Sequence, residues 1–265
     1  MSATAPSATA APALPARSAR QGAFREVGTV RHASIHAQRY RLAGTGKVLG
    51  MVDLDEGSFD GMLSVGGDLT ADRIESDGSL EVDGEVAVRE SLTARGTLKV
   101  GGRLSAGSLT FNGLGRVAKD VRVDTMLRYH GTLEANGDVS CGLFSPDGRF
   151  AILGSLAAKE VAGQFDGESH VDTIEASSVT LRPKAFVRLP VDIPPLRPKG
   201  TLTVARIEAT SVDLEGVSVH YLKAATIALG RNCHVAQVEG RVVRRDRSSY
   251  VGFESRSPPP PGLSH

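Results

Sequence analysis

A nine-residue pattern that recurs every seventeen or eighteen positions limits the possible folds of this chain more than any other feature. The string GSLEVDGEV at 78–86 returns with small changes as GMLSVGGDL from 61, GTLKVGGRL from 96 and GTLEANGDV from 131. Aligned on the leading glycine, the copies begin at Gly44, Gly61, Gly78, Gly96, Gly113, Gly131 and Gly148. Such a repeat indicates a solenoid, because each unit can bury its apolar side only against the next unit.

Within each unit, apolar residues alternate with polar ones, which is the period of a β-strand. We predict that the residues two and four positions after the leading glycine face a common core. In the clearest units these are Leu63, Val65, Leu80, Val82, Leu98, Val100, Leu133, Phe150 and Ile152. Position six is usually glycine, and at Gly84 we expect it to let the chain turn where a side chain would crowd the core.

These features predict an all-β fold, a single-stranded parallel β-helix with one repeat unit per coil and about three short strands in each. No stretch keeps the spacing of an amphipathic helix, and the Asp-Gly pairs fall in the repeat frame instead of joining hairpins. We expect about eleven coils over residues 24–243, a rod on the order of 50 Å long. A proline-rich interruption covers 182–200, and the tails at 1–23 and 244–265 are expected to be disordered.

Composition narrows the choice of partners and compartment. The 31 Lys and Arg residues balance 30 Asp and Glu residues, so no nucleic acid partner is expected. Two cysteines without metal-site spacing favour the reducing cytoplasm. The sequence contains no apolar run of about 20 residues, so membrane contact is expected to be indirect at most.

No residue pattern points to catalysis, and we expect no enzyme activity, cofactor or metal. Cys141 occupies an apolar position of its unit, and Cys233 and His234 should face opposite sides of a strand. His32 and His36 lack a third metal ligand. Recurring carboxylates are expected on solvated strand faces, balanced by bases such as Lys47, Lys99 and Arg103; they are Asp68, Glu81, Glu85, Glu134 and Asp138. The arginine-rich run at 241–247 is interpreted as the solvated exit of the rod.

The tandem G-x-[LFA]-x-V-x-G-x-[LV] units, the polar strand faces and the proline-rich tails resemble the bactofilins, bacterial polymer-forming cytoskeletal proteins. The resemblance covers roughly 27 to 240, and the segment 207–240 is similar to the ending of a bactofilin-like subgroup. The matching positions are Ile227, Leu229, Gly230, Cys233, Val235, Val238 and Glu239. The resemblance implies a right-handed coil and nucleotide-independent assembly into filaments that act as scaffolds for envelope or cell-shape proteins.

Elementary physics supports self-association, because the end coils of a solenoid expose unpaired backbone groups and apolar core residues. We expect the chain itself to be the main partner, with Ile227, Leu229, Val235 and Val238 at the associating terminal coil, and envelope or cell-shape proteins to bind through the tails. One alternative is a non-polymerising β-helix adaptor. Another is a β-helical carbohydrate-active enzyme, which the absence of tryptophan disfavours.

Overall fold

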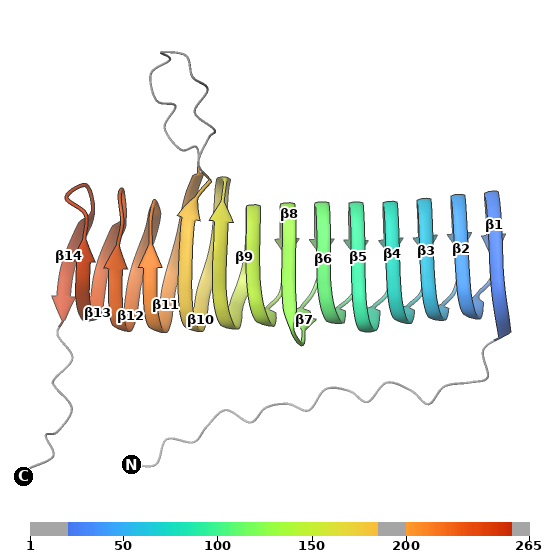
Figure 1. Ribbon diagram of the computed structural model, residues 1–265, viewed down its shortest axis with the longest axis horizontal. Coiled ribbons are helices and arrows are strands. Elements are labelled where there is room, and N and C mark those ends of the chain that lie inside the picture. The colour runs from blue at the N-terminus through green and yellow to red at the C-terminus, as the bar shows by residue number, and fades with distance from the viewer. Residues whose placement is uncertain (1–20, 185–199, 256–265) are drawn as a thin grey trace, which may run out of the picture.

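The computed structural model describes residues 21–184 and 200–255, whose strands form one continuous coil (Figure 1). About 13 turns of roughly 17 residues are stacked along the rod, so the predicted all-β parallel β-helix is confirmed. All neighbouring strands pair in parallel, and β7 and β8 share one coil between β6 and β9. The strands are β1 (Gln21–His32), β2 (Ile35–Val48), β3 (Val52–Val65), β4 (Leu69–Val82), β5 (Val86–Val100), β6 (Leu104–Val117), β7 (Val121–Val123), β8 (Met126–Ala135), β9 (Val139–Phe165), β10 (Gly167–Pro183), β11 (Gly200–Leu214), β12 (Val217–Leu229), β13 (His234–Arg245) and β14 (Tyr250–Ser255).

The expectation of about eleven coils was too low for two reasons. The coil begins at Gln21 and continues through β14 to Ser255, so residues 244–255 are not part of a disordered tail. The coils after β11 are also shorter than the regular ones: Gly44 of β2 pairs with Gly61 of β3, whereas Val204 of β11 pairs with Val219 of β12, two positions sooner. The remaining parts of the predicted tails and interruption, 1–20, 185–199 and 256–265, lie outside the described residues.

Side chains that face the axis form columns, with one residue contributed by each coil. The nine residues predicted from the repeat are all buried, at 0 to 2% exposure. They belong to two neighbouring columns, because Leu63 pairs with Leu80 and Leu80 with Leu98, while Val65 pairs with Val82 and Val82 with Val100. Burying each such side chain contributes about 1.5 to 3 kcal/mol, and the stacked coils do so without a break.

A third column was not foreseen from the repeat. It holds the residue two positions before each leading glycine, including Phe59, Phe111 and Tyr129. The rings of Phe111 and Tyr129 stack with their centroids 5.1 Å apart. This column is not recognisable as a repeat in the sequence, because its residues range from leucine and aromatic residues to Ser76 and Ala94.

The leading glycine, and not Gly84, makes the left-handed turn. Gly78 has a φ of 131°, and a Cβ atom built on it would lie 2.0 Å from the carbonyl oxygen of Gly61 in the preceding coil. At Gly84 φ is not left-handed, but an added Cβ would lie 2.7 Å from the carbonyl carbon of Gly67. Glycine is therefore required at both places by the close stacking of the coils, and only at the first by backbone conformation.

The outward carboxylates bind the neighbouring coil as well as facing water. Asp68 Oδ1 accepts a hydrogen bond from the Glu85 backbone N–H at 2.8 Å, and Asp138 Oδ1 does the same for Ser155. Glu134 pairs with Arg116 one coil earlier, with Nε 2.8 Å from Oε2. These groups hold corners and faces in register along the rod.

Candidate assembly surfaces at the two ends

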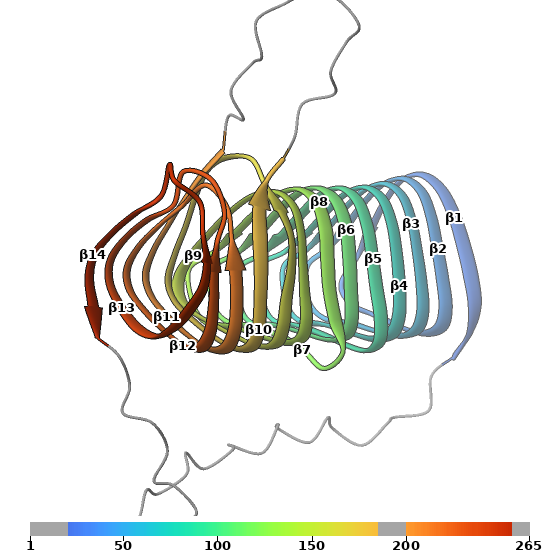
Figure 2. The same cartoon turned by 60° about the vertical axis from the view of Figure 1, so that its left-hand side comes forward.

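The oblique view in Figure 2 places β1 and β14 at opposite ends of the stack. Large apolar side chains that remain exposed gather near these ends. Five lie in or beside β1 to β3 and three in β13 and β14, so eight of the nine in the described part of the chain are close to an end. They are Phe24, Val27, Leu49, Met51 and Met62 near the first end, Val243, Tyr250 and Phe253 at the last, and Leu153 in the middle.

The N-terminal end is the free edge of β1, which pairs only with β2 among the described strands. Two of the core columns close here with polar residues, since Glu26 lies over Leu42 and His32 lies over Val48, whereas the column between them closes with Val30. Tyr40 Oη donates a hydrogen bond of 2.6 Å to Glu26 Oε2, and His32 Nε2 lies 2.8 Å from the same oxygen. An ionisable pair therefore caps an apolar core, one of the known ways in which a sheet edge is protected.

The electrostatics of this cap follow from those contacts. The hydrogen bond from Tyr40, followed by that from His32, lowers the pKa of Glu26, so the carboxylate stays charged at neutral pH. Burial and the carboxylate together raise the pKa of Tyr40 well above its ordinary value, so the phenol keeps the proton that it donates. Glu26 therefore places a negative charge in this core column, in a strand that also carries Arg25 and Arg31.

The C-terminal end is formed by β14 together with the second part of β13. Residues 234–239 of β13 are covered by β14, whereas Gly240–Arg245 carry no further coil among the described residues. Here too two columns end in polar residues, since Arg245 lies over Leu229 and Glu254 lies over Val238, whereas the column of Val235 ends with Val251. Arg245 donates to the Ser249 carbonyl oxygen at 3.1 Å, and its Nη1 lies 3.9 Å from Glu254 Oε1.

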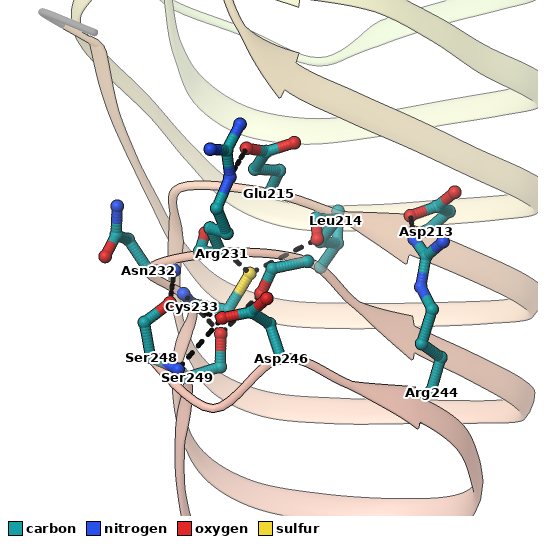
Figure 3. A network of polar contacts seen from close by, with 11 residues as sticks. Asp213, Leu214, Glu215, Arg231, Asn232, Cys233, Arg244, Asp246, Ser248 and Ser249 are labelled. Atoms are coloured by element: carbon teal, nitrogen blue, oxygen red, sulfur yellow. Dashed lines mark hydrogen bonds and ion pairs between the residues drawn. The ribbon is translucent and has the colours of Figure 1, made fainter. Parts of the chain in front are cut away.

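A polar turn joins β13 to β14 (Figure 3). Asp246 Oδ1 accepts hydrogen bonds from the backbone N–H and the hydroxyl of Ser248, and these bonds lower the pKa of Asp246. The Ser249 hydroxyl accepts a bond of 2.9 Å from the Cys233 N–H and donates to the Gly230 carbonyl. This buried serine fastens the last coil to the one beneath it.

The arginine-rich run at 241–247 is therefore a strand and turn, and not simply a solvated exit. Arg244 reaches two coils down the rod to Asp213, with Nη2 3.1 Å from Oδ1 (Figure 3). The same carboxylate also binds Arg182 at 3.0 Å. Sequence reasoning assigned the arginines to solvent because it could not place the carboxylates of the coils below.

The residues proposed for the associating coil, Ile227, Leu229, Val235 and Val238, are buried at 0 to 1% exposure. That assignment was wrong, because β13 and β14 continue the stack beyond them. The end itself was missed, because Val251 is identified as a core residue only by its pairing with Val235 in the structure. The exposed aromatic residues Tyr250 and Phe253 lie in this same strand, β14.

The cysteines and histidines pack or pair locally. Burial raises the pKa of Cys141 to about 12. Cys233 is fully buried, with its thiol 3.3 Å from the Leu214 carbonyl, while His234 faces outward beside Tyr250. His36 Nδ1 lies 3.9 Å from Asp53, apart from the Glu26–His32 pair.

Within 21–184 and 200–255, no three His, Cys, Asp or Glu side chains are grouped so that they could hold a metal ion. In the same ranges, no helix has the length and apolar character needed to span a membrane.

Comparison of the chain with protein-family models, with curated proteins and with solved structures gives no match. The parallel β-solenoid is thus established by the structure itself, and the likeness to bactofilins is carried by the repeat and ending residues alone.

Proposed function

We propose that this protein is a bactofilin-like scaffold that self-assembles through its end coils without a nucleotide. The observation that carries the proposal is the position of the exposed apolar side chains, eight of nine of which, among the described residues, lie close to an end of the rod. In the proposed end-to-end contact a second copy would cover those in line with the core, such as Phe24, which lies over the buried Tyr40.

The strand edges support the same role. The free edge of β1 and the open edges of β13 and β14 carry backbone N–H and C=O groups without a coil beyond them among the described residues. Adding a parallel strand from another copy would satisfy these groups with the geometry already used along the rod. Assembly needs no energy source, because each contact repeats one that is present within the chain.

The proposal includes the reducing cytoplasm as the site of action and a structural, non-catalytic role. Ionisable groups on the described faces are used to join coils, as in the pairs Arg73–Glu90 and Arg95–Asp77. Recruitment of envelope or cell-shape proteins is assigned to the tails, which lie largely outside the described residues.

The test is the assembly state of the purified full chain, followed by sedimentation velocity and negative-stain microscopy over a range of concentration and salt. We expect elongated assemblies one rod wide. Phe24→Ser, at the end of a core column, should weaken them at least tenfold in the concentration required, while Leu153→Ser, a change of another exposed apolar residue in the middle of the rod, should not. A wild-type chain that stays monomeric under every condition would contradict the proposal.

One observation favours a second candidate, a non-polymerising adaptor. The charged residues Glu26 and Arg245 occupy core columns at the two ends, and polar terminal repeats keep other solenoids monomeric. For an adaptor, the same experiment would give monomers, and removal of either tail would abolish partner binding without changing sedimentation.

A further inference from the structure

The three asparagines of the chain, Asn112, Asn136 and Asn232, lie in different environments. An asparagine side chain can react with the backbone nitrogen of the next residue and close a five-membered succinimide ring. A following glycine favours this reaction, because it has no Cβ to obstruct the ring and allows the backbone to rotate. Asn112 and Asn136 are each followed by glycine, so their surroundings decide whether either of them reacts.

Two of the asparagines precede a residue that is held in place. Asn232 precedes Cys233, whose backbone N–H donates a hydrogen bond of 2.9 Å to Ser249 Oγ. Asn112 precedes Gly113, which lies inside β6 and pairs with a glycine of the coil on each side. Ring closure at either place requires the backbone to open locally first.

Asn136 and Gly137 form an exposed corner between β8 and β9, outside the paired strands. At the four equivalent glycine corners nearer the N-terminus, the glycine N–H donates a hydrogen bond of 2.7 to 3.2 Å to the coil beneath; the donors are Gly50, Gly67, Gly84 and Gly102. Within the described residues, the Gly137 N–H donates no such bond, and the Asn136 side chain has no hydrogen-bond partner. Both reacting groups are therefore free at this corner.

The close stacking of the coils requires the glycine but not the asparagine. A Cβ atom added to Gly137 would lie 2.4 Å from Asp120 Oδ1 and 2.8 Å from the carbonyl carbon of Lys119 in the coil beneath. The position of Asn136 follows the last buried residue of its strand, and other coils place varied residues there; they are Leu49, Gly66, Asp83, Gly101, Ala118 and Leu153. Nothing in the packing of the corner calls for an amide at 136.

We propose that Asn136 is a site of spontaneous covalent modification, at which the side-chain amide is lost through a succinimide. The Gly137 nitrogen attacks Cγ of Asn136, the new N–Cγ bond forms, and the Cγ–Nδ2 bond breaks. The side-chain nitrogen leaves as ammonia and carries away the proton of the Gly137 N–H. Water then opens the ring at one of its two carbonyl carbons and leaves aspartate or isoaspartate at position 136. The reaction needs no oxidant, cofactor or other protein, and the inference is independent of the proposed function.

The modification should loosen the middle of the rod. Isoaspartate adds one CH₂ group to the backbone directly before Asp138, which holds the coils on both sides. The Asp138 N–H donates to Asp120 Oδ1 at 3.2 Å, and its carbonyl oxygen accepts a bond of 2.8 Å from the Val121 N–H. Its Oδ1 accepts the Ser155 N–H of the following coil at 2.8 Å. Both products also place a new negative charge beside these two carboxylates.

Mass spectrometry of the aged full chain tests the inference. Cleavage after Lys and Arg places the three asparagines in separate peptides, 104–116, 129–149 and 232–241. The folded chain is kept at mildly alkaline pH, sampled over time and compared with a sample digested at once. Conversion in peptide 129–149 should be faster than in 104–116 by roughly tenfold or more, because only Asn112 requires local opening. Its rate should rise with pH, since the attacking nitrogen must lose its proton.

An unfolded sample and one variant serve as controls. In guanidinium chloride the two Asn-Gly peptides should react at similar rates. Asn136→Ala, which copies the residue at Ala118, should abolish conversion of 129–149. Ageing should lower the thermal unfolding temperature of the wild-type chain but not that of Asn136→Ala.

Three results would overturn the inference. The first is equal conversion of the two Asn-Gly peptides in the folded chain. The second is an unmodified 129–149 peptide in the folded chain while the unfolded chain reacts. The third is the same preference for Asn136 in guanidinium chloride as in the folded chain, because local sequence and not the free corner would then explain it.

Discussion

The middle of the rod and its two ends use the same columns for opposite purposes. Between β2 and β6 these columns are filled by residues such as Leu42, Phe59 and Val82, which are buried by coils on both sides. At the ends the same columns carry Glu26 and His32, or Arg245 and Glu254, beside exposed apolar groups such as Phe24 and Phe253. Each middle coil is covered on both sides within the chain, whereas each end coil is covered on one side only among the described residues.

In the proposed assembly this difference would control how copies join. Apolar ends alone would associate in any register, because the hydrophobic effect has no direction. Charged residues placed in the core columns make costly any contact that leaves them buried and unpaired. We therefore expect substitutions in the middle to change stability, and substitutions at the ends to change assembly.

The largest effect on stability is expected at the leading glycines, which stack on one another from coil to coil. Gly78→Val places a side chain against the Gly61 carbonyl and forces a left-handed residue to accept a branched Cβ, so the free energy of unfolding should fall by about 4 kcal/mol or more. Gly28 has a φ of 94° but nothing within 4 Å of an added Cβ. Gly28→Ala should therefore cost only about 1 to 2 kcal/mol. Urea unfolding of dilute protein measures both, and equal losses would contradict the comparison.

Removal of a core leucine is the next effect in size. Leu80→Ala should lower the free energy of unfolding by about 2 to 5 kcal/mol, because coils on both sides prevent the cavity from collapsing. Val243→Ser at the exposed end should leave the thermal unfolding of the dilute chain nearly unchanged while weakening assembly. A Val243→Ser chain that loses as much stability as Leu80→Ala would show that this end is already covered.

A smaller effect concerns pH at the N-terminal cap. The pKa of Glu26 is lower in the folded chain than its ordinary value of 4.5, so the stability that it contributes is present above that value and is lost as the pH falls toward the folded pKa. Amide exchange in β1 should accelerate over this acidic window, once corrected for intrinsic rates, and Glu26→Gln should remove the dependence. Exchange at Leu80 gives the internal control, since no such group touches it.

The smallest expected effect is a gain in stability. The hydroxyl of Ser76 is buried and lacks a hydrogen-bond partner in the described part of the chain. Ser76→Ala should raise the free energy of unfolding by about 1 kcal/mol, because the desolvated hydroxyl is removed. Thermal unfolding of Ser76→Ala measures this gain. The control is Ser79→Ala, a change outside the core columns in the same strand. A loss of stability in Ser76→Ala would mean that the hydroxyl is satisfied in solution.

Much of the rod could be predicted from the amino-acid sequence, because its stabilising contacts recur at a fixed spacing. The alternation around Leu80 and Val82, together with the leading glycines, specifies strands that face a common axis, and the structure has those residues buried. The column of Phe59, Phe111 and Tyr129 was missed, since its residues are too varied to be recognised as a repeat.

The ends could be placed only by the tertiary structure. An arginine run looks solvated until Asp213 and the Ser249 carbonyl are found beneath it, and Val251 is recognised as core only when it stacks on Val235. The sequence by itself determined the unit and the direction of stacking, because these are local and repeated. Tertiary structure alone decided where the stack stops and which residues close each column, because this depends on the summed register of every coil between the two ends.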